Sequence, residues 1–271
     1  MRGFRPLALA LLTVLLTAVL TAVTALTAGA AGAAPPPVRY VALGDSYSSG
    51  LGAGSSYTGG SCDRSGGAFS ALWSASHAPA SYTSLACAGA TTATVMSSQL
   101  PSVASTTTLI SITAGGNDVG FANIMTTCAL HGTSDCVAAV NDAENAANMS
   151  LPAQLDRTYS AISSAAPAAK VVVLSYPLFY QLHVWYCVGL SETSRTKIDE
   201  GINLVDDLTA AAAGRHGFTF ADVRSAFAGH QLCSGSKWLH AVDLAHIQES
   251  YHPTASGQQN AYLPVFSAAV G

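Results

Sequence analysis

The stretch that decides the fold runs from Val38 to Gly50 and reads Val-Arg-Tyr-Val-Ala-Leu-Gly-Asp-Ser-Tyr-Ser-Ser-Gly. Its apolar run, residues 40–43, predicts a buried strand that ends abruptly at Gly44. Ser46 is therefore expected in a sharp turn at the carboxyl edge of a sheet, with an exposed hydroxyl and free backbone N–H groups around it, as a nucleophilic serine requires. The alternative is an ordinary strand-to-helix turn, where Gly, Asp and Ser are common for local reasons.

Other apolar runs alternate with helical patterns along the rest of the chain. Further strands are predicted at residues 82–87, 109–113, 170–175 and 218–223, and helices at 68–76, 91–100, 151–166, 192–214 and 255–268. In the helix 151–166, Ser150 is the expected N-cap and Pro152 lies in the first turn. The alternation predicts one α/β domain over residues 34–271, with a mostly parallel sheet covered by helices on both faces.

The first residues have a different composition. Arg2 and Arg5 precede an apolar run from Leu7 to Val23, and small residues follow at 28–33. This pattern predicts a secretory signal peptide over residues 1–33, and hence an extracellular protein. A retained membrane anchor is the alternative, since the run approaches spanning length, but its threonines and the small-residue site favour removal.

Charge and length exclude some classes of function. The 271 residues carry a formal net charge of −4, and removal of residues 1–33 would take away two arginines and no acid. Because no basic run remains to neutralise phosphates, a nucleic-acid partner is not expected.

Cysteine and histidine spacing argues against a metal site. The six cysteines, none in a C-x-x-C pair, are Cys62, Cys87, Cys128, Cys136, Cys187 and Cys233. In a secreted chain this even count predicts three disulfides, and we prefer the sequential pairing because it closes the shortest loops. His230, His240 and His246 lack the spacing of a zinc motif, so surface or packing roles are expected for them. No metal and no cofactor are expected.

Polar and aromatic residues follow other predicted strands. Gly89 follows the strand 82–87 and would let backbone approach a ligand closely. Asn117, which follows two glycines, is either an ordinary turn residue or an amide donor aimed at a developing oxyanion. The segment 176–190 leaves the strand 170–175 at the same edge, and we expect its aromatic side chains to line an apolar groove rather than simply to plug the domain. These aromatic residues are Tyr176, Phe179, Tyr180, Trp185 and Tyr186.

Four short sequence blocks follow one another along the chain: Gly44-Asp45-Ser46, Gly89, Gly115-Gly116-Asn117-Asp118 and His252-Pro253. Together they resemble the blocks of the SGNH or GDSL family of hydrolases, over nearly the whole mature chain. The residues in these blocks are similar to those of the secreted lipases, esterases and phospholipases A1 of actinomycetes. The resemblance implies a flavodoxin-like three-layer α/β/α sandwich around a five-stranded parallel sheet, without a mobile helical lid.

The resemblance also implies roles for individual residues. Ser46 would be the nucleophile and His252 the base, while the N–H groups of Ser46 and Gly89 and the side-chain amide of Asn117 would form the oxyanion hole. Ester hydrolysis through an acyl-enzyme needs these parts, namely an activated serine and donors that bind the tetrahedral oxyanion. The α/β-hydrolase class fits less well, because the sequence after Ser46 lacks the second glycine of G-x-S-x-G.

One position departs from the family pattern. Much of the family has Asp three residues before the catalytic histidine, where this chain has Glu249. A histidine base needs an acceptor for its other ring N–H. The Glu249 carboxylate, or the backbone carbonyl of Glu249 or Ser250, can supply it. We favour a carbonyl, and hence a Ser46–His252 dyad.

The sequence therefore predicts a secreted, monomeric serine carboxylic-ester hydrolase that acts on acyl lipids, of the lipase or phospholipase A1 type, with transient contact to a lipid surface. An acetylesterase acting on acetylated polysaccharide is the first alternative, and a non-catalytic secreted binding domain is a remoter one. The complete set of Ser, Gly, Asn and His counts against the binding domain. The aromatic segment 176–186 favours long acyl chains over acetyl groups.

Overall fold

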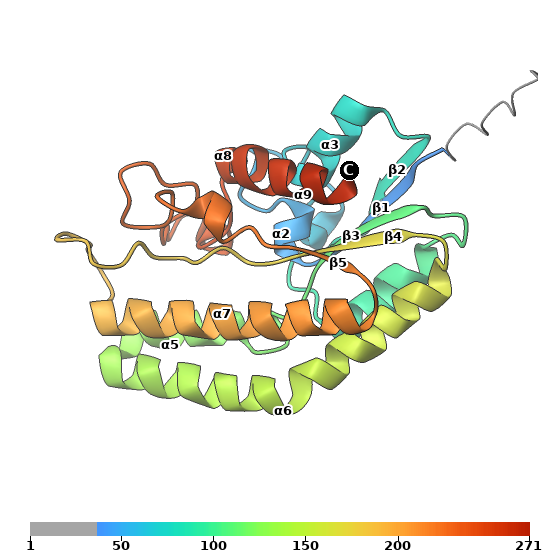
Figure 1. Ribbon diagram of the computed structural model, residues 1–271. Coiled ribbons are helices and arrows are strands. Elements are labelled where there is room, and N and C mark those ends of the chain that lie inside the picture. The colour runs from blue at the N-terminus through green and yellow to red at the C-terminus, as the bar shows by residue number, and fades with distance from the viewer. Residues whose placement is uncertain (1–36) are drawn as a thin grey trace, which may run out of the picture. The chain divides into compact units, whose positions relative to one another are not determined.

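Five parallel strands form the central sheet of the computed structural model, which describes residues 37–271 (Figure 1). They are β1 (Arg39–Gly44), β2 (Ser81–Ser84), β3 (Leu109–Thr113), β4 (Lys170–Leu174) and β5 (Thr219–Ala221). The order across the sheet is β2-β1-β3-β4-β5, and every neighbouring pair is parallel. All five predicted strands are present, with β2 and β5 shorter than expected. The predicted signal peptide, residues 1–33, lies outside the described residues.

Helices cover both faces of this sheet, which confirms the predicted three-layer class. Figure 1 shows α3 and α9 on one face and α6 and α7 on the other. The α-helices are α2 (Ser46–Ser49), α3 (Phe69–His77), α4 (Thr92–Thr94), α5 (Phe121–His131), α6 (Thr133–Ala165), α7 (Glu192–Arg215), α8 (Ala255–Gly257) and α9 (Leu263–Val270). Shorter 3₁₀ and π segments lie at Gly60–Cys62, Val95–Gln99, Leu100–Ser102, Ser225–Phe227, Ile247–Glu249 and Gln258–Tyr262. Within residues 37–271, no helix combines the length and apolarity needed to cross a bilayer.

The core lies on both sides of the three central strands. Every residue of β3 is buried, as are four of the five residues of β4. Parallel strands covered on both faces have continuous apolar sequences rather than alternating ones, which is why these strands were predictable.

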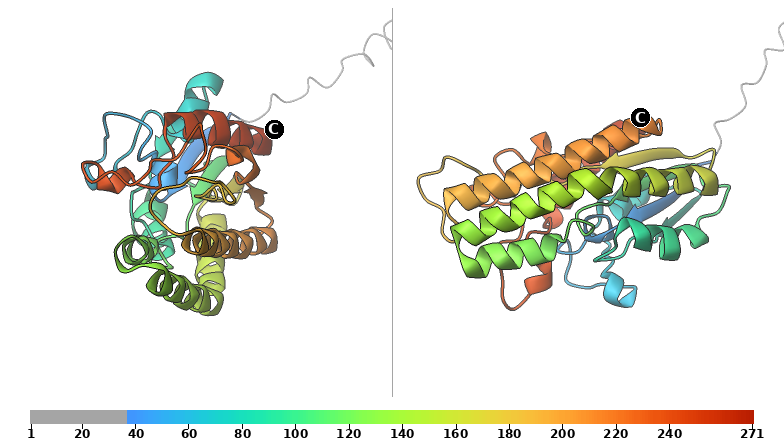
Figure 2. Two further views of the ribbon diagram at one scale, coloured as in Figure 1. Left: turned by 90° about the vertical axis from the view of Figure 1, so that its left-hand side faces the viewer. Right: turned by 90° about the horizontal axis from the view of Figure 1, so that it is seen from below.

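The helix α6 differs from the prediction. The proline was expected to mark a helix start at 151, but α6 runs unbroken from Thr133 and contains Pro152 in its interior. Ser150, the predicted N-cap, instead donates its hydroxyl to the carbonyl of Ala146 one turn earlier. A proline inside a helix removes one backbone hydrogen bond and bends the helix. Figures 1 and 2 show α6 changing direction along its length, so that its first part lies beside α5 and α7, beyond the end of the sheet.

Three disulfides join the six cysteines, and among residues 37–271 no cysteine is free. The pairs are Cys62–Cys87, Cys128–Cys136 and Cys187–Cys233. The second pair links the last turn of α5 to the first turn of α6, which fixes the two helices side by side.

Candidate active site

The end of β1 is held in a conformation that only glycine accommodates. Gly44 has φ 115°, and a Cβ built on it would lie 2.2 Å from the carbonyl oxygen of Thr113 on β3. The Gln99 side-chain amide bonds both the N–H and the carbonyl of Gly44, each at 2.8 Å. The backbone therefore turns sharply between two strands, and α2 begins directly after it.

Ser46 is the first residue of α2 and faces His252. Its Oγ lies 2.7 Å from Nε2 of the imidazole. The residue is only 7% exposed, which corrects the expectation of an exposed hydroxyl. The loops that follow the other strands close over the turn, so Ser46 lies at the floor of a cavity rather than on an open edge.

Asp45 holds this turn to the rest of the fold. Its carboxylate accepts hydrogen bonds from the N–H of Tyr47 at 3.0 Å, the hydroxyl of Thr113 at 2.6 Å and the hydroxyl of Tyr176 at 2.5 Å. Burial raises the pKa of Asp45 to about 6, against the opposing effect of these three donors. The residue is the N-cap of α2, and it joins the turn that carries Ser46 to β3 and to the segment after β4.

His252 is oriented by a backbone carbonyl two residues earlier. Its Nδ1 lies 3.1 Å from the carbonyl oxygen of Ser250. Because a carbonyl only accepts, Nδ1 carries the proton, and Nε2 is left to accept the proton of the Ser46 hydroxyl. Burial lowers the pKa of His252 to about 4, so the imidazole is neutral at pH 7.

The intervening Tyr251 has φ 68°, a left-handed conformation that is strained for a bulky residue. Its surroundings hold it there. The carbonyl of Tyr251 accepts the Tyr47 hydroxyl at 2.8 Å, its hydroxyl accepts that of Tyr180 at 3.2 Å, and its ring stacks on Phe179. This backbone turn brings the Ser250 carbonyl within hydrogen-bond distance of Nδ1 of the imidazole.

The Glu249 carboxylate points elsewhere. It accepts the hydroxyl of Tyr57 at 2.6 Å, and that hydroxyl in turn accepts the N–H of Gly52 at 3.1 Å. Of the two candidates for orienting the histidine, Ser250 therefore makes the contact through its backbone. Glu249 instead ties the loop that carries His252 to the loop after α2.

Three N–H donors lie near the Ser46 hydroxyl, one of them the backbone N–H of Ser46 itself. Among residues 37–271, the backbone N–H groups of Ser46 and Gly89 donate to no protein acceptor, and both residues line the same cavity. Asn117 also lines it, and its amide donates one hydrogen to the carbonyl of Ala90 at 3.0 Å. This bond orients the amide and leaves its second hydrogen available. Asp118 accepts from the N–H of Thr92 at 3.0 Å, which ties the loops of Gly89 and Asn117 together.

A cavity of about 770 Å³ extends from Ser46 and His252 between α5, α6 and α7. Its walls are almost entirely apolar. The helices contribute Phe121, Ile124, Met125, Ala129, Leu130, Val140, Ala143, Ala147, Ile198, Ile202 and Val205. The size is that of a small-molecule site, and the lining suits an extended hydrocarbon chain.

The aromatic segment after β4 was only partly interpreted correctly. Tyr176 and Phe179 line the cavity, but Tyr180 does not. Trp185 and Tyr186 are 97% and 65% exposed and also lie outside the cavity wall. Eleven of the residues that line the cavity lie on α5 and the first part of α6, which were not predicted from the sequence. A helical signal was present, because Phe121, Ile124, Met125 and Cys128 recur at i, i+3, i+4 and i+7.

Two of the other histidines, His230 and His240, make packing and hydrogen-bond contacts within the domain. His240 contacts the carbonyl of Gly52 through Nε2 at 2.8 Å, and His230 stacks on Trp238. In the part of the chain that the structure describes, no group of three or more His, Cys, Asp or Glu residues is arranged to hold a metal ion.

A parallel α/β sandwich with a hydrogen-bonded Ser–His pair, three nearby N–H donors and an apolar cavity defines a class of serine hydrolases that cleave esters. The chain belongs to the GDSL-like Lipase/Acylhydrolase family, whose sequence model matches residues 42–259. The expected family and its lipase and esterase class are therefore confirmed.

Individual relatives are similar over most of their length. Lipase 1 of Streptomyces coelicolor is 50% identical, over 99% of this chain and all of its own. The crystal structure of an extracellular lipase from Streptomyces rimosus shares 53% identity with a TM-score of 0.83, covering 86% of this chain and 99% of that one. A phospholipase A1 from Streptomyces albidoflavus NA297 shares 47% identity with the same TM-score and coverage.

Proposed function

We propose that the protein hydrolyses the esters of long-chain acyl lipids, phospholipids included, with Ser46 as nucleophile and His252 as base. The observation that carries this proposal is the 2.7 Å contact between Ser46 Oγ and His252 Nε2 in the wall of a largely apolar cavity of about 770 Å³. A cavity of this volume suits a fatty acyl group, whereas an acetyl group would leave most of it empty.

In the first half-reaction, Ser46 Oγ attacks the ester carbonyl as Nε2 of His252 takes its proton. The N–H groups of Ser46 and Gly89 and the amide of Asn117 bind the oxyanion of the tetrahedral intermediate. The Ser250 carbonyl accepts the Nδ1–H throughout, so the imidazole keeps the correct tautomer. The imidazolium then protonates the departing alcohol, which leaves an acyl-Ser46 ester.

In the second half-reaction, His252 takes a proton from water, and the resulting hydroxide attacks the acyl-Ser46 carbonyl. The same donors bind the second oxyanion, and the fatty acid leaves as Ser46 regains its proton. The low pKa of His252 keeps Nε2 free to accept a proton at neutral pH in both half-reactions.

The phospholipase A1 assignment is the finer part of the proposal. It is supported by the overall likeness to the phospholipase A1 of Streptomyces albidoflavus NA297 and by the apolar cavity. We further propose that the protein is secreted after removal of residues 1–33 and acts as a monomer. Three disulfides favour an oxidising compartment, and the similar Streptomyces rimosus lipase is described as extracellular.

The decisive test is Ser46→Ala, assayed on p-nitrophenyl esters from acetate to palmitate. We expect a loss of turnover on the order of a million-fold in a folded protein, because removing the nucleophile alone costs about as much as removing all the groups that act with it. Ser49→Ala is the matched control: this hydroxyl lies on the same turn but contacts the Ser46 and Asp63 carbonyls, so activity should be retained. More than about a thousandth of the parent turnover in folded Ser46→Ala would refute the assignment.

Substrate class is tested with the parent enzyme. Cleavage of palmitate esters in preference to acetate, followed by release of the sn-1 acid from a mixed-chain phosphatidylcholine, would support the lipid proposal. Activity confined to acetyl esters would favour the acetylesterase alternative, and release of the sn-2 acid would refute the A1 assignment.

A further inference from the structure

Several large apolar side chains are exposed on the cavity wall and on the loop before α7. We call this set the apolar rim, and it consists of Leu130, Trp185, Tyr186, Val242, Leu244 and Ile247. Single exposed apolar residues are common, but a group of them beside a binding site marks an interaction surface.

Part of the apolar rim is continuous with the site. Leu130, Val242, Leu244 and Ile247 line the cavity that contains Ser46, yet Leu130 is 72% and Leu244 is 87% exposed. Apolar side chains that reach solvent and the reacting hydroxyl therefore belong to the wall of one cavity. The same wall also includes Asp63 and Glu144.

The remaining rim residues lie on the loop before α7. Figures 1 and 2 place this loop, residues 182–190, at the same end of the molecule as the loop 241–249. The rings of Trp185 and Tyr186 pair at 5.5 Å, and Trp185 is 97% exposed.

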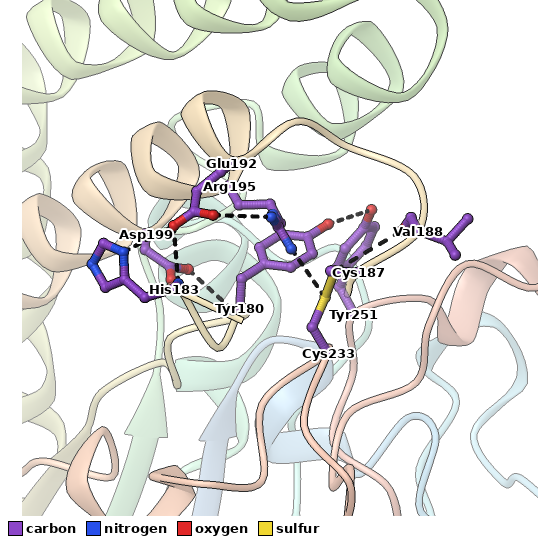
Figure 3. Close-up of a disulfide and its surroundings, with 9 residues drawn as sticks. All are labelled: Tyr180, His183, Cys187, Val188, Glu192, Arg195, Asp199, Cys233 and Tyr251. Carbon is purple, nitrogen blue, oxygen red and sulfur yellow. Dashed lines mark hydrogen bonds and ion pairs between the residues drawn. A yellow bond between two sulfur atoms is a disulfide. The ribbon is translucent and has the colours of Figure 1, made fainter. Parts of the chain in front are cut away.

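The base of this loop is anchored, as Figure 3 shows. Cys187 is bonded to Cys233, and the N–H of His183 donates to Glu192 at 2.9 Å. Arg195, which is buried, lies 3.5 Å from both Glu192 Oε2 and Cys233 Sγ. The loop is thus held at His183 and at Cys187, directly beside the two aromatic residues, while the Trp185 and Tyr186 side chains remain in solvent. A tryptophan is more usually buried against the domain.

The charge of these segments argues for a zwitterionic rather than an anionic partner. Neither 182–190 nor 241–249 contains a lysine or arginine, the exposed Asp243 in 241–249 pairs with His246, and the whole chain has a net negative charge. A surface of this composition does not attract anionic polymers or headgroups. It suits insertion between the headgroups and acyl chains of a lipid aggregate, where tryptophan and tyrosine are favoured.

We propose that the apolar rim docks the enzyme on the surface of aggregated zwitterionic phospholipid, with the cavity opening toward the acyl chains. This inference rests on the proposed function, since it explains how an insoluble ester reaches Ser46. Docking by apolar contact predicts binding that changes little between low and high salt and does not require anionic lipid.

The test uses Ser46→Ala protein, so that vesicles stay intact, and phosphatidylcholine vesicles. Of the three tryptophans, Trp73 is buried and Trp238 is partly buried, so a blue shift on vesicle addition reports chiefly on Trp185. We expect that blue shift in the Ser46→Ala protein. We also expect its affinity for vesicles, measured by cosedimentation, to fall on the order of ten-fold when Leu244→Ser, or the pair Trp185→Ser and Tyr186→Ser, is added.

Met149→Ser is the matched control, because Met149 is 81% exposed but lies on α6 outside the cavity wall. It should bind vesicles like the parent. Equal binding by all variants, or an equal loss in Met149→Ser, would overturn the proposal. So would a parent dimer that becomes monomeric in Trp185→Ser, since the rim would then be a self-association surface.

Activity separates this inference from the proposed function. With Ser46 restored, Trp185→Ser should hydrolyse soluble p-nitrophenyl acetate like the parent but act about ten-fold more slowly on vesicle lipid. Equal loss on both substrates would refute docking, whereas inactivity of the parent on every ester would refute the proposed function instead.

Discussion

Replacing Glu249 by glutamine tests which group orients His252. The change removes the carboxylate charge but keeps an oxygen that can accept the Tyr57 hydroxyl, now 2.6 Å from Glu249. The Nδ1 contact with the Ser250 carbonyl at 3.1 Å is left intact. If the carbonyl orients the histidine, the substitution should affect the reaction only through the position of the loop.

The expected loss of rate differs widely between orientation of His252 by the Ser250 carbonyl and orientation by the Glu249 carboxylate. Exchanging a charged for a neutral acceptor at one partly buried hydrogen bond costs about 1 kcal/mol, or roughly five-fold in rate if all of it is felt at His252. Loss of a true triad carboxylate costs on the order of ten-thousand-fold. We therefore expect Glu249→Gln to keep kcat/KM within about ten-fold of the parent.

The assay is kcat/KM on p-nitrophenyl butyrate, with circular dichroism to confirm folding. Tyr57→Phe is the complementary control, because it keeps the Glu249 carboxylate but removes the hydroxyl that bonds Glu249 and the Gly52 N–H. It should have a similarly small effect. A folded Glu249→Gln protein with a thousand-fold loss, beside an active Tyr57→Phe, would show that the carboxylate is the third catalytic group.

Three further changes test other parts of the site. Asn117→Ala should lower kcat by about a hundred- to a thousand-fold with little change in KM, and a change confined to KM would assign Asn117 to substrate binding. Because protonated His252 cannot act as a base, kcat/KM should fall as pH drops through about 4, and an acid limb near 6.5 would contradict the lowered pKa. Ala147→Phe should narrow the cavity and reduce palmitate hydrolysis on the order of ten-fold relative to acetate, whereas Ala146→Phe, on the exposed side of the same helix, should not.

The central strands of the sheet were predictable because they are buried on both faces. Residues 171–174 are apolar without interruption, and Leu109–Thr113 is buried throughout and rich in leucine and isoleucine. The four family blocks implied that Ser46 and Asn117, just after β1 and β3, belong to one site. Ser46 and Asn117 do line one cavity.

What the sequence did not reveal depends on contacts between distant residues. Pro152 is tolerated inside α6, although proline more often marks a helix start. Ser250 and Glu249 are neighbours, and choosing between them required the position of Tyr57, 192 residues away from Glu249. The exposure of Trp185 likewise depends on how its loop is anchored, which no local pattern reports.

The acceptor for His252 is a main-chain atom, and this has a consequence for how the site tolerates change. A carboxylate can be deleted by one base change or neutralised by acid, whereas the Ser250 carbonyl survives every side-chain replacement and has no pKa. Its only adjustable element is the left-handed turn at Tyr251, whose strain of about 1–3 kcal/mol is borne by the aromatic packing around it. If this contact orients the base, the site depends here on a backbone conformation rather than on a titratable group. We then expect mutations in the packing of Tyr251 to impair activity more than replacement of Glu249 does.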